Sequence, residues 1–207
     1  MPENLHKLFV ISSPSGGGKT SLINKLFEDS RSANFEKSIS DTSRQKRQGD
    51  LEGKDYYFLS EKDFKDKIKK EEYVEYATVF GNFYGTSKEE IKKKYNNSNL
   101  ILELDWQGAY AVKEIFDDAK LIFLVPPSLD DLKQRLIKRN LDSSEAIENR
   151  LSEAKKEISK SEIYDYLVLN DDFDKAFEDL SQILFEGISP KDFNSRASKD
   201  LIKRLVE

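Results

Sequence analysis

The chain has 207 residues, a formal net charge of −5 and no cysteine, and its length suits one α/β domain with a sizeable core. The acidic balance argues against broad nucleic-acid binding, which needs a face rich in lysine and arginine, and the absence of cysteine excludes disulfides, thiolate metal sites and thiol nucleophiles. Because no apolar run approaches the roughly 20 residues of a membrane helix and the first residues lack the pattern of a secretory signal, we expect a cytoplasmic protein with neither membrane nor nucleic-acid partners.

The first predicted elements are a buried strand at 8–11 and a helix at 21–27 with one apolar face. Between them lies a glycine-rich segment, Ser13-Pro14-Ser15-Gly16-Gly17-Gly18-Lys19-Thr20, in the strand–turn–helix context that a P-loop requires. Glycines let backbone N–H groups turn toward phosphate oxygens, and the helix N-terminus adds a partial positive charge. We expect Lys19 to reach the outer phosphates of a nucleotide and the Thr20 hydroxyl to hold Mg²⁺. Ser13 stands where the general pattern has its first glycine.

The segment at about 39–83 is rich in tyrosine, aspartate, lysine and glycine and has short alternating stretches, which indicate a small, partly β insertion. Further buried strands are expected at 100–104, at 121–125 and, from a weaker pattern, at 166–169. A helical pattern follows each of them. This alternation of strands and helices predicts a parallel sheet covered on both faces.

Highly charged helical sequence fills 129–160, and the tail at 188–207 predicts a loop and a final amphipathic helix.

Ligands of open α/β sheets bind at the carboxyl ends of the strands. Asp105 follows the strand expected at 100–104, so we expect it to face the same crevice as the P-loop. There it can orient a Mg²⁺-bound water or a cationic side chain, although an aspartate at this place is also common as a helix cap.

Two arginines of the insertion, Arg44 and Arg47, are three residues apart and can converge on a phosphate, each with a bidentate fork. Tyr56 and Tyr84 are flanked by glycines and can present hydroxyls to the same phosphate. Taken alone, these residues also fit a solvated basic loop and tyrosines that serve only packing.

In chain order, seven blocks of the sequence resemble guanylate kinases, the enzymes that phosphorylate GMP to GDP with ATP. The blocks are 12–20, 41–50, 53–58, 72–77, 81–86, 103–108 and 170–172. The resemblance spans about residues 7–186 and implies one guanylate kinase-like domain over 1–207. It implies an α/β P-loop three-layer fold with a parallel sheet, whose core comprises about 1–38, 99–127 and 161–207. A small α/β GMP-binding insertion at about 39–98 and a helical lid at about 128–160 complete this expected fold.

The resemblance also implies which side chains bind the acceptor GMP. Glu75 would read guanine, because a carboxylate can accept hydrogen bonds from both the N1–H and the exocyclic amine, a pair of donors that adenine lacks. The phosphate of GMP would be held by Arg44, Arg47, Tyr56 and Tyr84. The remaining residues of the expected GMP site are Ser40, Thr86, Glu103 and Asp105.

The resemblance assigns ATP to the P-loop, with Ser13, Pro14, Ser15, Gly16, Gly17, Gly18, Lys19, Thr20, Ser21 and Asn170 as binding residues. Mg²⁺ would be held by Thr20, with Asp105 acting through water. The expected catalytic residues are Lys19, Arg44, Arg135, Arg139 and Arg150, the last three as lid arginines that close over the ATP phosphates. No general base is required, because a phosphate oxygen of GMP is itself a competent nucleophile.

Three alternatives stay open at this point. A guanylate kinase-like interaction module that has lost catalysis would have a degraded P-loop, whereas Lys19 and Thr20 are present. A regulatory GTPase fits the Asp-x-x-Gly pattern at 105–108, but no Asn-Lys-x-Asp sequence accompanies it. The acceptor can also be a different nucleoside monophosphate.

Ser43, Asp50 and Asn140 depart from the usual wording of the family without removing a charge that the mechanism needs. The tail would pack on the core or join a contact between the subunits of a homodimer.

Overall fold

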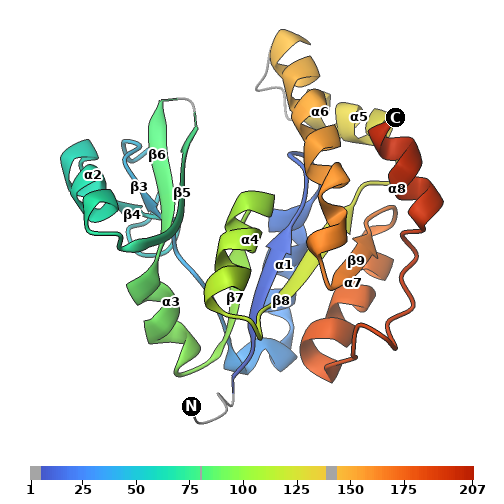
Figure 1. Cartoon of the computed structure of the whole chain (residues 1–207), viewed down its shortest axis with the longest axis horizontal. Coiled ribbons are helices and arrows are strands. Elements are labelled where there is room, and N and C mark those ends of the chain that lie inside the picture. Colours follow the sequence, from blue (N-terminus) through green and yellow to red (C-terminus); the bar gives the residue numbers. More distant parts are fainter. Residues whose placement is uncertain (1–5, 80, 139–143) are drawn as a thin grey trace. The chain divides into compact units, whose positions relative to one another are not determined.

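The computed structural model describes residues 6–79, 81–138 and 144–207 (Figure 1). The chain divides into two compact units. The first unit comprises Met1–Phe9, Phe35–Leu102 and Gln107–Ala119, and the second comprises Val10–Asn34, Glu103–Trp106 and Lys120–Glu207. None of the helices in the described ranges has the length and apolar character needed to cross a membrane.

A five-stranded sheet has the strand order β2-β7-β1-β8-β9. Its members are β1 (Leu8–Ser12), β2 (Phe35–Lys37), β7 (Asn99–Glu103), β8 (Lys120–Val125) and β9 (Tyr166–Leu169). Both edge pairs, β2 with β7 and β8 with β9, are parallel. All of β1 and the last five residues of β8 are buried. Strands covered on both faces need unbroken apolar sequence, which accounts for the runs at 8–11 and 121–125.

In the first unit, a four-stranded sheet has the order β4-β3-β6-β5. Its strands are β3 (Asp41–Thr42), β4 (Tyr57–Phe58), β5 (Tyr73–Val79) and β6 (Asn82–Ser87). Strand β6 pairs antiparallel with both β3 and β5. Helix α2 (Glu61–Lys69) buries Phe64, whose ring stacks on Tyr73 with 4.5 Å between centroids and on Phe83 with 5.3 Å. This aromatic cluster fixes α2 against the sheet.

The other helices of the first unit are α3 (Lys88–Tyr95) and α4 (Trp106–Ile115), whose first residue lies in the second unit. The second unit contains α1 (Lys19–Glu28), α5 (Leu129–Lys138), α6 (Ser144–Ser159), α7 (Phe173–Ser181) and α8 (Lys199–Val206), together with the short helical turns Ser30–Asn34, Ser161–Ile163 and Gln182–Glu186. Helix α1 buries Leu22, Ile23 and Leu26 and packs on α7. Helix α8 packs on α6, so the tail lies against its own chain.

The expected α/β fold with a parallel sheet is confirmed, and each predicted core strand lies within one residue of its predicted bounds. The insertion contains β3 to β6, as its alternating pattern indicates, together with α2, as expected for a small α/β insertion. The sequence analysis missed strand β2, because Phe35–Lys37 is short and not fully buried and so leaves no apolar run.

Candidate active site

The P-loop forms a hollow of about 120 Å³ in the second unit, and residues 13–20 line it. Gly16 and Gly18 have φ angles of 85° and 89°, in the left-handed region that glycine adopts without strain. Gly17 is required for space, because a Cβ there would lie 2.8 Å from the Cβ of Ser13. The serine that departs from the general P-loop pattern is therefore accommodated by the glycine four residues later.

Helix α1 starts directly after Gly18, and no side chain of the described residues caps its N-terminus. The first N–H groups of a helix have no partners within the helix, and they lie at the positive end of the helix dipole. An uncapped N-terminus that borders a glycine-rich hollow is suited to phosphate oxygens.

The end of β7 and the residues after it hold the two polar side chains at the start of α1. The Lys19 ammonium donates to the carbonyl of Leu104 at 3.1 Å, and the Thr20 hydroxyl donates to Glu103 Oε1 at 2.6 Å. Ser12 Oγ lies 3.5 Å from the carbonyl oxygen of Asp105. Residues 103–105 therefore lie beside the P-loop. We expected Glu103 in the GMP site, and the structure places its carboxylate on the hydroxyl assigned to Mg²⁺.

Glu157 of α6 is a further ionisable group near this hollow, and the sequence analysis did not single it out. Its pKa is raised to about 7, chiefly because burial disfavours the charged carboxylate. The positive charge of Lys19 opposes this rise, while the negative charges of Asp105 and Glu153 add to it. A carboxyl group that titrates near neutral pH thus shares the electrostatic environment of the P-loop lysine.

Two of the predicted lid arginines contact residues of the expected ATP site. Arg150 donates to the hydroxyl of Ser15 at 3.1 Å, and Arg135 donates to the carbonyl of Asn170 at 2.9 Å. Asn170 is 4% exposed, and its side-chain amide donates to the carbonyl of Gly17 at 2.7 Å. Arg139 lies outside the described residues.

The predicted phosphate-binding residues of the insertion lie in the first unit, and three of them come together. The guanidinium carbon of Arg44 lies 5.4 Å from the ring centre of Tyr56, and the rings of Tyr56 and Tyr84 meet edge to face with 5.7 Å between centroids. Arg44 also forms an ion pair with Asp50 at 2.9 Å, which raises the pKa of the arginine. The backbone N–H of Arg47 donates to the same carboxylate at 2.7 Å.

Asp50 therefore connects the two arginines. Hydrogen bonding by Arg47 and then by Arg44 lowers the pKa of the Asp50 carboxyl, which favours its charged form. From the sequence alone, Asp50 is only a departure from the usual wording of the family. The ion pair depends on a turn between the two residues, which the sequence pattern did not reveal.

The predicted guanine-reading carboxylate is held from the neighbouring strand. Glu75 on β5 lies opposite Thr86 on β6, and the Thr86 hydroxyl donates to Glu75 Oε1 at 2.6 Å. Thr86 is fully buried, whereas Glu75 is half-buried, so the bond is partly shielded from water. Ser40 directly precedes β3, whose Thr42 lies opposite Tyr84.

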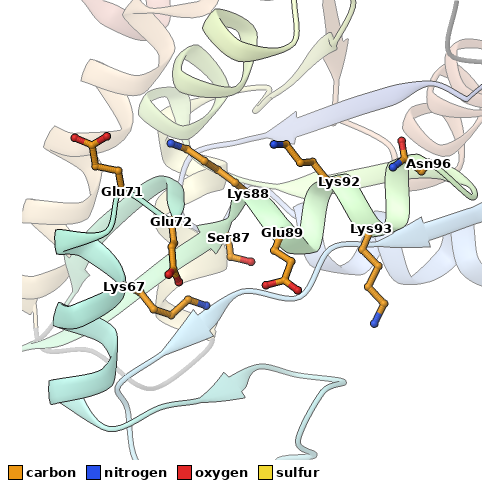
Figure 2. A pocket seen from close by; sticks show the side chains of 9 residues that line it. All are labelled: Lys67, Glu71, Glu72, Ser87, Lys88, Glu89, Lys92, Lys93 and Asn96. Atoms are coloured by element: carbon orange, nitrogen blue, oxygen red, sulfur yellow. The ribbon is translucent and has the colours of Figure 1, made fainter. Parts of the chain in front are cut away.

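A separate hollow of about 520 Å³ lies elsewhere in the first unit (Figure 2). Figure 2 shows its side chains projecting from the end of α2, the segment after it and the length of α3. The lining residues are Lys67, Glu71, Glu72, Ser87, Lys88, Glu89, Lys92, Lys93 and Asn96. None of the predicted GMP-binding residues lines this hollow, and its lysines and glutamates nearly balance in charge.

Among the described residues, no three or more His, Cys, Asp or Glu side chains gather as a metal-binding cluster. Mg²⁺ at nucleotide sites usually takes one or two protein oxygens and fills its other positions with substrate phosphates and water. The side-chain oxygens of Thr20 and Glu103 meet at the start of α1, Asp105 follows Glu103 by two residues, and these oxygen donors fit such an ion.

Comparison with known proteins identifies the family of this chain. The family model described as guanylate kinase matches residues 5–187. The guanylate kinase of Wolbachia sp. subsp. Brugia malayi (strain TRS) is 45% identical over 184 residues, which cover 88% of this chain and 93% of that protein. The guanylate kinase of Coxiella burnetii (strain RSA 493) is 40% identical over 205 residues, 99% of this chain and 98% of the relative. The crystal structure of guanylate kinase from Anaplasma phagocytophilum superposes with a TM-score of 0.69 and 31% identity, covering 99% of this chain and 98% of that one. This chain belongs to the guanylate kinase family.

Proposed function

We propose that this chain transfers the γ-phosphoryl group of ATP to GMP, forming ADP and GDP, and that dGMP is a second acceptor. One observation favours a catalytic member of the family over a non-catalytic interaction module. The P-loop hollow has both functional side chains, Lys19 and Thr20, held at the start of an uncapped helix. A non-catalytic interaction module has no need of this arrangement.

On the donor side, residues 13–21 bind the phosphates of ATP, mainly through backbone N–H groups that follow Pro14, and Lys19 bridges the outer phosphates. Asn170 contributes near the adenine while it holds the carbonyl of Gly17. Thr20 would hold Mg²⁺, with Glu103 and Asp105 at hand to orient its water ligands. When bound, this ion neutralises charge on the ATP phosphates.

On the acceptor side, Arg44, Arg47, Tyr56 and Tyr84 hold the GMP phosphate. Glu75 accepts from the N1–H and amine of guanine, with Ser40 and Thr86 at the same end of the base. Because the Thr86 hydroxyl already occupies one lone pair of Glu75, the carboxylate is oriented before GMP arrives. Pre-orientation of this kind reduces the entropy lost on binding.

Catalysis then consists of positioning and charge neutralisation, as expected for phosphoryl transfer. A phosphate oxygen of GMP attacks the γ-phosphorus, and the bond to the β–γ bridging oxygen breaks, so that ADP leaves. Arg44, Arg135 and Arg150 stabilise the charge of the transition state, and we assign the same role to Arg139. We expect the reaction in the cytoplasm, where both substrates are available.

The deciding experiment is an acceptor panel. ADP production from ATP and Mg²⁺ is measured with GMP, dGMP, AMP, UMP and CMP. We expect turnover with GMP and dGMP and little with the other nucleotides. No GMP-dependent ADP would favour the interaction module, GTP hydrolysis that does not depend on GMP would favour a regulatory GTPase, and a preference for AMP would overturn the role of Glu75.

A further inference from the structure

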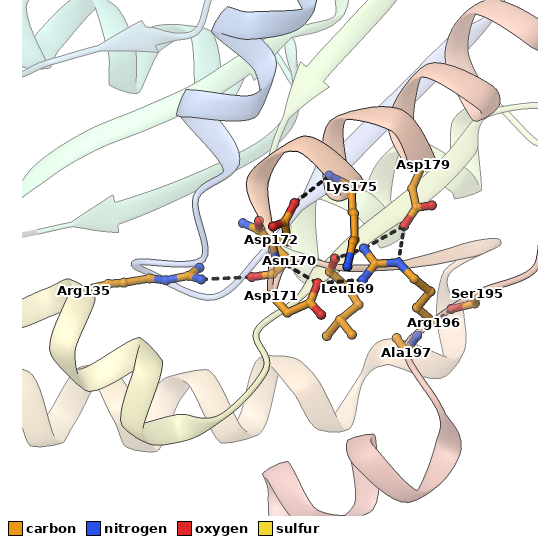
Figure 3. A network of polar contacts seen from close by, with 10 residues as sticks. All are labelled: Arg135, Leu169, Asn170, Asp171, Asp172, Lys175, Asp179, Ser195, Arg196 and Ala197. Atoms are coloured by element: carbon orange, nitrogen blue, oxygen red, sulfur yellow. Dashed lines mark hydrogen bonds and ion pairs between the residues drawn. The ribbon is translucent and has the colours of Figure 1, made fainter.

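The carboxyl-terminal tail contains an arginine with an unusually full set of partners. Arg196 lies beyond residue 187, where the match to the family model ends. Its guanidinium donates to Asp171 Oδ1 at 2.6 Å and to the carbonyl of Leu169 at 2.8 Å. It also donates twice to Asp179 Oδ2, at 3.2 and 3.1 Å (Figure 3). One side chain thereby joins the end of β9, the loop after it and α7.

The pKa shifts of the two aspartates in this cluster agree with their hydrogen bonds to Arg196. Arg196 lowers the pKa of the Asp171 carboxyl, so this partner stays charged. Burial raises the pKa of Asp179, and the positive charge of Arg196 opposes that rise. The neighbouring Ser195 hydroxyl donates to the carbonyl of Leu167, so the tail is attached to β9 at a second point. Hydrogen bonds between charged groups are about twice as strong as neutral ones.

The residue between these anchors belongs to the ATP half of the site. Asn170 is flanked by Leu169 and Asp171, both of which accept hydrogen bonds from Arg196. Asn170 in turn donates to the carbonyl of Gly17 in the P-loop, and its own carbonyl accepts from Arg135. Figure 3 shows Arg135 and Arg196 approaching this short segment from different elements.

The P-loop has little room for Asn170 to move toward it. A Cβ at Gly18 would lie 2.5 Å from the amide nitrogen of Asn170, so the two segments are in close contact. The backbone of Asn170 is fixed as well, because its N–H donates to the carbonyl of Val125 at 2.8 Å. The loop after β9 is therefore anchored on the sheet, on the P-loop and on the tail.

We propose that Arg196 is a positioning residue for ATP. Arg196 fixes the loop after β9, and Asn170 in this loop then holds the carbonyl of Gly17 and the guanidinium of Arg135 in the positions that ATP binding requires. This inference rests on the proposed function, because it concerns the same donor site. It assigns a role to the tail, which lies beyond the end of the family-model match at residue 187 and for which the sequence pattern predicts only packing or a subunit contact.

The test compares three variants, Arg196→Ala, Arg196→Lys and Arg204→Ala, the last being an exposed arginine of the same tail. Steady-state KM values for ATP and for GMP are measured separately well below the melting temperature, and the binding of each nucleotide alone is measured by calorimetry. We expect Arg196→Ala to raise the KM and the Kd for ATP about three- to tenfold and to leave those for GMP within about twofold. Arg196→Lys keeps the charge but not the fork, so its effect should be intermediate, and Arg204→Ala should match the parent.

An unchanged KM for ATP, or an equal rise in both KM values, would overturn the positioning role. If Arg196→Ala does not fold, Asp171→Asn replaces it, and a selective rise in the KM for ATP is again required. Failure of the proposed function looks different, because the unmodified chain would then form no ADP with GMP. Calorimetry with ATP alone would still test Arg196 in that case.

Discussion

Replacing Thr86 by valine tests how the candidate guanine-binding carboxylate is oriented. Thr86 is fully buried and donates to Glu75 at 2.6 Å, within the usual range for a hydroxyl that donates to a carboxylate. Valine fills nearly the same volume but lacks the donor. Glu75 stays in place on β5 but can then occupy other rotamers.

The size of the effect follows from the entropy of the glutamate side chain. The Thr86 bond is present before GMP binds, so its own energy does not contribute directly to GMP affinity. What the variant loses is the pre-orientation of Glu75, and immobilising a flexible side chain on binding costs about 1 kcal/mol. That value corresponds to roughly a fivefold rise in the KM for GMP, since 1.4 kcal/mol is about tenfold.

The assay measures the KM for GMP at saturating ATP, the KM for ATP at saturating GMP, and the melting temperature. Thr78→Val is the matched control, because Thr78 is an exposed threonine of the same strand as Glu75. Glu75→Ala gives the upper limit of the effect on GMP. The reasoning would be wrong if Thr86→Val lowered the melting temperature but left the KM for GMP unchanged, or if the KM for ATP rose as much.

Three further variants address other parts of the site. Lys19→Ala should abolish transfer while the circular dichroism spectrum stays that of the parent, since Lys19 is not part of the core; retained turnover would contradict its role at the phosphates. Asp50→Ala removes the acceptor shared by Arg44 and Arg47 and should raise the KM for GMP about three- to tenfold; a lower KM would show that the carboxylate competes with phosphate. The pKa of Glu157 is raised to about 7 in the folded chain, so the native state binds the extra proton and stability falls as the pH rises from about 4.5 to 7. Without nucleotide or Mg²⁺, Glu157→Gln should therefore melt at a higher temperature than the parent at pH 8 and at a similar temperature at pH 5. The same difference in melting temperature at both pH values would contradict the raised pKa of Glu157.

The elements that could be predicted from sequence are those whose signal is local. The P-loop is contiguous, and its strand and helix carry buried apolar residues at the expected spacing. Strands β3 and β4 contain two residues each, so their pairing is set by partners elsewhere in the insertion. Periodicity cannot detect elements of that length.

Contacts between residues far apart in the chain could not be predicted either, because no local pattern marks them. Glu157 is an ordinary acidic residue of a charged helix until packing buries it near Lys19. The partners of Arg196 lie up to 27 residues earlier in the chain, and no motif marks them. The expected place of Glu103 in the GMP site comes from a family block and stays a prediction, while its hydrogen bond from Thr20 is a contact across 83 residues that no sequence pattern marks.

Arg44 and Arg135 have different resting partners, and these partners bear on how each would reach its place in the proposed mechanism. Arg44 is paired with a carboxylate, and a guanidinium has enough donors to keep that ion pair while it binds a phosphate. Arg44 is thus held ready before GMP arrives. Arg135 rests on the neutral carbonyl of Asn170, and a phosphate oxygen is a much stronger acceptor for a guanidinium. The proposed transfer of Arg135 from this carbonyl to the ATP phosphates would therefore cost little, as the proposed lid role requires.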